Sequence, residues 1–293
     1  MQILILSRNI NLYSTQSLVN ACKMRGHTVH VIDHQLCDLV IQPGKTSIQY
    51  QGMQLLNIDA IIPRIGATAT QYGASVIRQF ECMGVVTLTR ADALLSARDK
   101  LTCLQILSNH GLPVPKTLVS NPIMMDPGFI QGNLTAPLVV KLQESTHGLG
   151  VILSESYANA ESIVETMYKL RERVIIQDFI KEAKGADIRA FVVGDQVVAS
   201  MKRQSKPGEF RSNLHRGATA SIEALTDLET EIVLQATKVI GLDVAGVDIL
   251  RSNSGPLIME VNASPGLEGI ETVTGVNIAD TIVSRLEQKC QSI

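Results

Sequence analysis

Two acidic side chains and an amide recur at alternate positions near the end of the chain. Asp248 lies in one apolar run, and Glu260 and Asn262 lie in a second run after Asn253-Ser254-Gly255. Apolar and β-branched residues in both runs predict two strands of a β-hairpin. A three-residue turn centred between the runs places Asp248 opposite Glu260 and puts Asn262 on the same face.

Two carboxylates that face each other across strands repel, so this arrangement needs a physical reason. Oxygen ligands from Asp, Glu and Asn suit a hard divalent cation such as Mg²⁺ or Mn²⁺, and the sequence therefore predicts a metal site. The same register pairs Leu250 with Ile258 and sends Met259 to the opposite face. The alternative is a solvated polar face, because surface strands also carry acids.

Two lysines stand where a positive charge is unfavourable without an anion. Lys141 lies in the predicted strand Pro137–Leu142, where a buried ammonium is costly unless it reaches an anion. Lys100 lies in the first turn of a helix that Asp99 can cap, against the helix dipole. The glycines of Gly148-Leu149-Gly150 allow backbone N–H groups to approach phosphates closely. Together these features predict a phosphate site.

A basic segment, predicted as a loop between sheet strands, runs from Lys202 to Arg216 and holds five Lys or Arg residues against one acid. Its arginines favour an anion clamp over a solvated charge run, and His215 is interpreted as a structural donor. Arg64 follows a predicted strand, at the edge where open α/β sheets bind ligands. A surface arginine is an equally good interpretation there.

Composition excludes several classes of protein. The chain has 293 residues, 45% of them hydrophobic and 18% charged, which is typical of a soluble globular protein with two or three lobes. A net charge of −2 and only 3% aromatic residues argue against a nucleic-acid binder. Five scattered cysteines without a Cys-x-x-Cys spacing argue against disulfides or zinc and suit the cytoplasm. No stretch is long and apolar enough to span a bilayer, and the N-terminus is interpreted as a strand rather than a signal.

The first 95 residues alternate predicted strands and helices, beginning with Ile3–Leu6 and Thr28–Asp33. Such alternation predicts a parallel sheet with crossover helices, and hence the α/β class. The loop Ser7–Asn11 contains no glycine, so a dinucleotide site is rejected there.

Longer motifs carry a resemblance to a known family. The most specific are Gly208–Gly217, Val244–Leu250 and Met259–Glu271, supported by Arg98-Asp99-Lys100-Leu101. With these motifs the chain resembles the RimK family of the ATP-grasp superfamily, carboxylate–amine ligases that add glutamate to the C-terminus of small-subunit ribosomal protein six. The resemblance covers nearly the whole chain. It implies an α/β (α+β) fold with a Rossmann-like pre-ATP-grasp domain and two subdomains that clasp ATP, at residues 1–95, 96–178 and 179–293.

The resemblance also implies roles for individual residues. ATP would be bound by Lys100, Lys141, Gln177, Asp178, Phe179, Ile180, Asp187, Arg211, Ser212 and Asn213. Two Mg²⁺ or Mn²⁺ ions would be held by Asp248, Glu260 and Asn262. The implied catalytic residues are Arg203, Arg211 and Asn213, and the implied substrate contacts are Arg64, Arg203 and Arg216. The chain departs from the family pattern at Asp178, where Glu is more common, and at Ala218, where a second glycine is usual.

The expected activity is an ATP- and Mg²⁺-dependent ligase that forms an amide through an acyl phosphate and adds L-glutamate to the tail of a ribosomal protein. The alternatives are a ligase for a small-molecule or carrier-protein carboxylate, poly-α-glutamate synthesis, a kinase, and a non-catalytic nucleotide-binding module. The resemblance further implies a cytoplasmic homo-oligomer, with a tetramer as the expected state. Neither direct nucleic-acid binding nor a membrane is expected.

Overall fold

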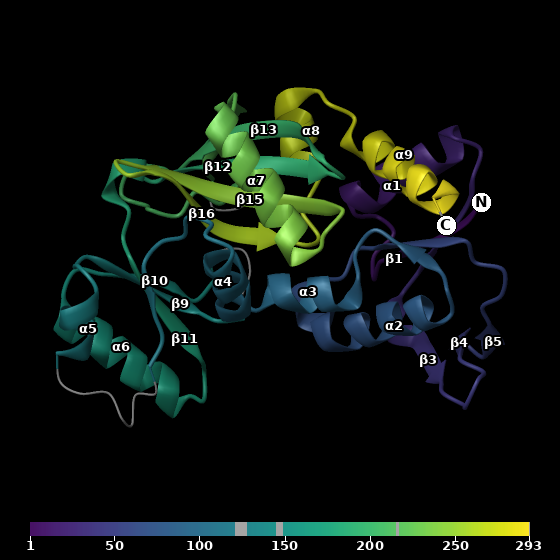
Figure 1. Cartoon of the computed structure of the whole chain (residues 1–293), viewed down its shortest axis with the longest axis horizontal. Coiled ribbons are helices and arrows are strands. Elements are labelled where there is room, and N and C mark those ends of the chain that lie inside the picture. The colour runs from purple at the N-terminus through teal and green to yellow at the C-terminus, as the bar shows by residue number, and fades with distance from the viewer. Residues whose placement is uncertain (121–127, 145–148, 215–216, 293) are drawn as a thin grey trace.

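Four β-sheets and the helices packed on them make up the computed structural model (Figure 1), which describes residues 1–120, 128–144, 149–214 and 217–292. The N-terminal sheet has the order β2-β1-β6-β7 and all its pairs are parallel. Its strands are β1 (Gln2–Leu6), β2 (Thr28–Ile32), β6 (Ala60–Pro63) and β7 (Val86–Thr87). The helices that follow β1 and β6 are α1 (Tyr13–Met24) and α2 (Thr70–Cys82). The predicted parallel sheet is therefore present.

A small antiparallel sheet between β2 and β6 was not predicted from the sequence. It follows the 3₁₀ helix η1 (His34–Leu36) and consists of β3 (Cys37–Val40), β4 (Ser47–Tyr50) and β5 (Met53–Gln54). These strands have two to four residues each and mix polar with apolar side chains, so they show no sustained alternation.

The central sheet has the order β10-β9-β11-β8 and is antiparallel. Its strands are β8 (Thr117–Leu118), β9 (Leu138–Leu142), β10 (Val151–Ser154) and β11 (Val174–Asp178), and its helices are α5 (Phe129–Asn133) and α6 (Tyr157–Lys169). One face is apolar and buries Leu138, Val140 and Ile176 with Val164 of α6. Period-2 alternation along β9 therefore turns Lys141 away from this small core.

The C-terminal sheet has the order β14-β13-β12-β15-β16 and is also antiparallel. Its strands are β12 (Ala186–Val193), β13 (Gln196–Gln204), β14 (Thr219–Ile222), β15 (Val244–Ser252) and β16 (Gly255–Asn262). The helix α7 (Asp227–Ile240) packs on it, beginning with a capping box between Thr226 and Glu229 and ending at Gly241 with φ 83°.

Helices α3 (Ala91–Arg98) and α4 (Lys100–Asn109) lead from the N-terminal sheet toward the other two sheets (Figure 1), and Asp99 caps α4 by accepting from the backbone N–H groups of Leu101 and Thr102. Three short 3₁₀ or helical segments complete the described part: η2 (Ala67–Ala69), η4 (Lys181–Ala183) and α8 (Glu268–Thr274).

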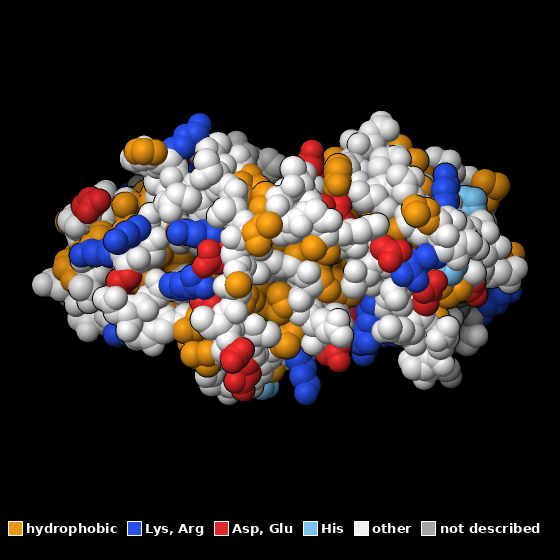
Figure 2. Space-filling model, turned by 90° about the horizontal axis from the view of Figure 1, so that it is seen from above, with side chains coloured by type: hydrophobic (Ala, Val, Ile, Leu, Met, Phe, Trp, Pro, Cys, Tyr) orange, Lys and Arg blue, Asp and Glu red, His pale blue; other side chains and the backbone are white. Residues whose placement is uncertain are grey.

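The final helix, α9 (Ile278–Gln291), returns the chain to its beginning, and the two termini lie at the same end of the molecule (Figure 1). It packs on α1, and Arg25 pairs with Asp280 and Glu287 at 2.7 Å. Ile282 and Leu286 of α9 are buried. None of the helices in the described ranges is long and apolar enough to cross a membrane. From above, acidic and basic side chains are interspersed with apolar ones (Figure 2).

The β15–β16 hairpin has the predicted strands but a different register. Ser252 pairs with Gly255, so the turn has two residues rather than three, and Leu250 pairs with Leu257 rather than Ile258. A bulge at Met259 then adds one residue to β16, which restores the predicted opposition of Asp248 and Glu260.

The shifted register also reverses the predicted faces near the turn. Because side chains alternate along a strand, a one-residue shift moves each of them to the other face. Ile258 is accordingly fully buried in the core, and Met259 lines the open pocket described below. The prediction that placed Met259 on the face opposite Asp248 was wrong.

The predicted basic loop also begins later than expected. β13 continues through Gln204, because residues up to Gln204 pair with both β12 and β14. Lys202 and Arg203 are therefore strand residues, and Arg203 is only 4% exposed. A buried charge is tolerated only where it is paired, and Arg203 is paired with two carboxylates.

Candidate active site

A deep pocket lies between the central and C-terminal sheets. The empty space among its lining residues is about 940 Å³, including open solvent at the mouth. All ten residues predicted to bind ATP line it, together with Arg203, Asp248 and Glu260. Arg64 and Asn262 are not among its lining residues, and Arg216, His215 and Gly148 lie outside the described part of the chain.

The wall between the two sheets is formed by the segment that connects them. The rings of Phe179 and Phe210 meet edge to face, with centroids 6.2 Å apart. Gln177 is buried and donates to the Thr117 hydroxyl at 2.8 Å, and Asp178 accepts from the backbone N–H of Thr135 at 2.8 Å. Apolar side chains and aromatic edges around a few fixed polar groups are typical of a site for a flat heterocycle.

Lys100 and Lys141 form the basic side of the pocket. Burial lowers the pKa of Lys141 to about 8; Glu260 opposes this shift and Lys100 adds to it. Burial likewise lowers the pKa of Lys100, and here too Glu260 acts in the opposite direction. Two partly buried ammonium groups that repel each other favour a polyanionic ligand between the sheets.

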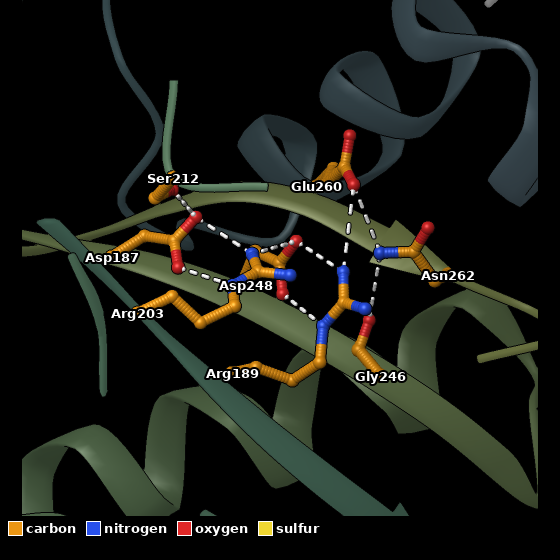
Figure 3. A network of polar contacts seen from close by, with 8 residues as sticks. All are labelled: Asp187, Arg189, Arg203, Ser212, Gly246, Asp248, Glu260 and Asn262. Atoms are coloured by element: carbon orange, nitrogen blue, oxygen red, sulfur yellow. Dashed lines mark hydrogen bonds and ion pairs between the residues drawn. The ribbon is translucent and has the colours of Figure 1, made fainter. Parts of the chain in front are cut away.

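A network of buried ion pairs forms the floor on the C-terminal sheet (Figure 3). Arg203 binds Asp187 through two hydrogen bonds of 2.7 and 2.6 Å, and its Nη2 reaches Asp248 at 2.9 Å. Arg189 binds Asp248 through two further bonds of 2.7 and 2.6 Å. Ser212 donates to Asp187 at 2.5 Å. Each charge in the network is thereby compensated.

The pKa values of the two acids in this network shift in opposite directions. Burial raises the pKa of Asp187 and the Asp248 charge adds to the effect, while Arg203 and the hydrogen bond from Ser212 oppose it. Burial also acts to raise the pKa of Asp248, but Arg189 and Arg203 together lower it to about 2. Asp248 is therefore ionised at neutral pH and keeps its negative charge inside the sheet.

Arg189 was not identified from the sequence, although it accounts for the opposed acids of the hairpin. It is the register partner of Asp248 on β12, and its Nη2 lies 2.6 Å from Asp248 and 3.9 Å from Glu260. The protein thus supplies one cation of its own to a pair of carboxylates that would otherwise repel. A single arginine within the apolar strand β12 was the signal that could have identified it.

The predicted metal ligands have oxygen donors that suit a hard divalent cation, but Asp248 is 1% exposed and both of its oxygens are bound by Arg189 and Arg203, so it would reach a metal ion only after these ion pairs rearrange. No three His, Cys, Asp or Glu side chains in the described ranges are placed to share a metal ion, so the candidate set combines two carboxylates with an amide. Asn262 donates its amide to Glu260 at 3.0 Å and to the Gly246 carbonyl at 3.3 Å (Figure 3), which leaves its Oδ1 oxygen available. The Glu260 side chain is 34% exposed. Oxygen donors on adjacent strands beside a phosphate pocket suit Mg²⁺ or Mn²⁺.

The remaining basic loop carries its own acid. Glu209 binds the Arg211 guanidinium at 2.9 and 2.8 Å, and this contact contributes most to lowering the pKa of Glu209 to about 2. Arg211 also lies over the Phe210 ring at 5.5 Å. On the other side of the pocket, Gly150 adopts a left-handed φ of 62°, so the described end of the predicted glycine loop has a conformation that favours glycine.

Comparisons with known proteins agree with this geometry. Residues 1–94 match the family model of the RimK pre-ATP-grasp domain, and residues 97–286 match that of the RimK-like ATP-grasp domain. The chain belongs to the RimK family. It is an ATP-dependent ligase by family, and the predicted ATP-grasp fold is confirmed.

One relative, described as probable alpha-L-glutamate ligase 1 of Hahella chejuensis, is 54% identical over 99% of this chain and 96% of its own length. Two solved structures share the fold of this RimK-family chain at lower identity. The ATP-grasp ligase PsnB, solved with a minimal precursor, Mg and ADP, has a TM-score of 0.73 at 19% identity over 99% of this chain and 98% of its own. D-alanine–D-alanine ligase of Bacillus anthracis with ATP has a TM-score of 0.69 at 18% identity over 100% and 98%.

Proposed function

We propose that this protein is an ATP-dependent ligase that joins the amino group of L-glutamate to an acceptor carboxylate, and that the acceptor is the C-terminal tail of a small-subunit ribosomal protein. The observation that carries the proposal is the concentration of cations on one side of the pocket, next to the oxygen donors of Glu260 and Asn262. The name of the Hahella relative supports glutamate as the added amino acid.

The pocket residues divide the work of holding ATP. The proposed adenine contacts are those of the connecting segment from Gln177 to Ile180, beside Phe210. Lys100, Lys141 and Arg211 bind phosphate oxygens, Ser212 and Asn213 position them, and Asp187 holds the ribose. Asp248, Glu260 and Asn262 hold two Mg²⁺ or Mn²⁺ ions, which when bound neutralise phosphate charge.

The reaction proceeds in two balanced steps. An oxygen of the acceptor carboxylate attacks the γ-phosphorus of ATP, and ADP leaves as the acyl phosphate forms. The amine of glutamate then attacks the acyl carbon and loses a proton, and inorganic phosphate leaves with one oxygen of the original carboxylate. Arg203 and Arg211 stabilise the negative charge that develops during both transfers.

The chain organisation is part of the same proposal. Residues 1–95 form a pre-ATP-grasp domain, residues 96–178 and 179–293 clasp the nucleotide from two sides, and the protein works as a homo-oligomer in the cytoplasm. Closure of the pocket would exclude water, because an acyl phosphate hydrolyses readily.

Isotope transfer tests the proposed chemistry directly. An acceptor whose C-terminal carboxylate carries ¹⁸O is incubated with ATP, Mg²⁺, L-glutamate and the protein. One ¹⁸O atom is expected in inorganic phosphate for each amide formed, as measured by mass spectrometry of the phosphate. Unlabelled phosphate with full amide formation would exclude the acyl phosphate.

The acceptor has one serious competitor, a free or growing glutamate chain. The cationic side chains of the site suit any chain of carboxylates, so poly-α-glutamate synthesis would use the same residues. Incubation with ATP and glutamate alone separates the two cases. Polymer formation without a protein acceptor favours synthesis of poly-glutamate, whereas a strict requirement for the ribosomal tail favours protein modification.

A further inference from the structure

Three segments meet beside the proposed metal ligands and outside the nucleotide pocket. Arg64 follows β6, Arg98 ends α3, and Ser264 lies in the turn after β16. Arg64 Nη2 donates to the Pro265 carbonyl at 2.7 Å, and Arg98 Nη2 donates to the Ile65 carbonyl at 2.6 Å. These two bonds join the N-terminal sheet to the turn after Asn262 and hold both guanidinium groups in place.

The turn that contains Ser264 and Pro265 lies close to the sheet because residue 246 is a glycine. A Cβ atom on Gly246 would lie only 2.8 Å from the Pro265 Cβ, so only glycine allows this approach without a shift. Gly246 is the register partner of Asn262, which links the position of the turn to that of the proposed metal ligands.

A guanidinium has five N–H donors. Among the described residues, Arg64 and Arg98 each donate one hydrogen bond. In the described part of the chain, Arg98 Nε and Ser264 Oγ are buried without a hydrogen-bond partner. No carboxylate of that part lies within 4.0 Å of either guanidinium, although every arginine of the buried floor is paired in this way. Buried donors and charges without partners are costly, so an acceptor from outside is the natural complement.

The electrostatics agree with this geometry. Burial and the neighbouring Arg98 lower the pKa of Arg64 to about 10. Burial also lowers the pKa of Arg98, and Glu260 is the acid that opposes it. Arg98 in turn acts on Lys100, so the two arginines extend the basic side of the pocket away from the lysines. ATP phosphates compensate the lysines in the proposed function, but the arginines do not line that pocket.

We propose that Arg64, Arg98 and Ser264 form a second anion site, beside the nucleotide pocket, that binds a carboxylate of one of the two ligase substrates. The inference rests on the proposed function for the identity of the substrates. Planar guanidinium groups match the two oxygens of a carboxylate, and a serine hydroxyl adds a donor. The bound carboxylate lies next to Glu260 and Asn262, so the site positions a substrate at the place of bond formation.

Steady-state kinetics of Arg98→Gln and Ser264→Ala test the proposal. Loss of a charged hydrogen bond of about 1.5–3 kcal/mol predicts a KM for one carboxylate substrate about 10- to 100-fold higher in Arg98→Gln, with a smaller rise in Ser264→Ala. The Kd for ATP is expected to stay within about twofold. Arg90→Gln is the matched control, because its side chain begins the same helix and is 69% exposed.

The two substrates identify the source of the carboxylate. A higher KM for L-glutamate alone assigns the site to the incoming amino acid, and a higher KM for the acceptor alone assigns it to the acceptor tail. Unchanged KM values for both overturn the proposal, and so does a loss of ATP affinity of the same size, which would make Arg98 a phosphate contact. Arg98→Lys keeps the charge but not the paired donors, and an intermediate KM is expected.

Direct binding separates this proposal from the proposed function. Calorimetry of the full chain with Mg²⁺ and ADP measures the affinity for L-glutamate and for glutarate, which cannot be ligated because it has no amine. Weaker binding to Arg98→Gln than to wild type, at the same melting temperature, supports the site even where wild type fails to ligate glutamate. Equal binding by both proteins, or no binding of either probe to wild type, overturns it.

Discussion

The active site contains two groups of charged side chains. In one group opposite charges are paired, and in the other like charges are neighbours. The ion-pair floor consists of Asp187, Arg189, Arg203 and Asp248, and each of its charges meets an opposite charge within 3 Å. The cationic row consists of Arg64, Arg98, Lys100 and Lys141; Glu260 attracts the last three, and Asp99 and Glu144 also attract Lys100.

The difference indicates which charges stabilise the ligand-free fold; Asp187, Arg203 and Asp248 of the floor also have ligand or catalytic roles in the proposed function. A buried pair that satisfies both partners is stable only as a unit, and removing one partner leaves a charge in a medium of low dielectric constant. Like charges that lie side by side repel one another, so an anion that arrives from outside stabilises the row. We therefore expect changes in the floor to affect folding first, and changes in the row to affect binding first.

The largest effect on stability is expected for Arg203→Met in the floor. Asp187 would keep only the Ser212 hydroxyl, and breaking a buried pair costs about 3–5 kcal/mol. The apparent melting temperature should fall by about 10 °C, measured by scanning calorimetry. Arg78→Met is the control, because its pair with Asp92 is 47% and 73% exposed and should change stability by less than about 1 kcal/mol. A fall no larger than that of the control would contradict the assignment.

Lys141→Met in the row should show the reverse pattern. Affinity for ATP is expected to fall by about 10- to 100-fold, since a charge-assisted contact to phosphate is lost. The melting temperature of the ATP-free protein should stay the same or rise, because a desolvated ammonium is replaced by an apolar side chain. Calorimetric titration and a thermal melt measure the two quantities. The control is Lys169→Met, at an exposed position in the same lobe, which should change neither the ATP affinity nor the melting temperature. A large loss of stability in Lys141→Met would contradict the distinction between row and floor.

A smaller effect is expected from pH. The pKa of Lys141 is lowered to about 8. The side chain is therefore fully protonated well below this pH and loses its positive charge as the pH rises through it. The Kd for ATP at saturating Mg²⁺ should therefore be about tenfold higher at pH 9 than at pH 7. Lys141→Arg should remove most of this dependence, because arginine stays protonated. A flat profile in wild type would show that Lys141 does not bind phosphate in its charged form.

The smallest effect is expected for Arg251→Met, a paired arginine on the same sheet as the floor. Its side chain is 44% exposed and binds Glu223 and Glu229. Its loss should cost about 1 kcal/mol and lower the melting temperature by about 2–4 °C. Affinity for ATP and the turnover rate should not change. Reduced turnover at an unchanged melting temperature would place a catalytic contribution outside the site.

The sequence predicted the contents of the site better than its internal connections. Lys141 stood out because a lysine in an apolar strand needs an anion, and in the structure Lys141 lines the pocket. Arg189 carries the same kind of signal, but its pairing with Asp248 depends on the register of β12 against β15, 59 positions apart in the chain. Residue types alone do not specify such a register.

The hairpin shows a limit of a different kind. The predicted opposition of Asp248 and Glu260 is confirmed, although the turn is one residue shorter than predicted and a bulge at Met259 compensates. The bulge bends β16 and opens the Met259 side chain to the pocket, an outcome that alternation cannot predict. Likewise, Arg64 and Arg98 were visible in the sequence, but only the packing of three distant segments shows that no described carboxylate lies within 4.0 Å of either guanidinium.

Mass spectrometry of the acceptor tests the central claim most directly. The full-length protein is incubated with ATP, Mg²⁺, isotopically labelled L-glutamate and a small-subunit ribosomal protein. The account predicts a ladder of labelled glutamate residues at the C-terminus of the acceptor, with one ADP formed for each residue added. A stably phosphorylated acceptor, or ADP formation without any labelled product, would contradict it.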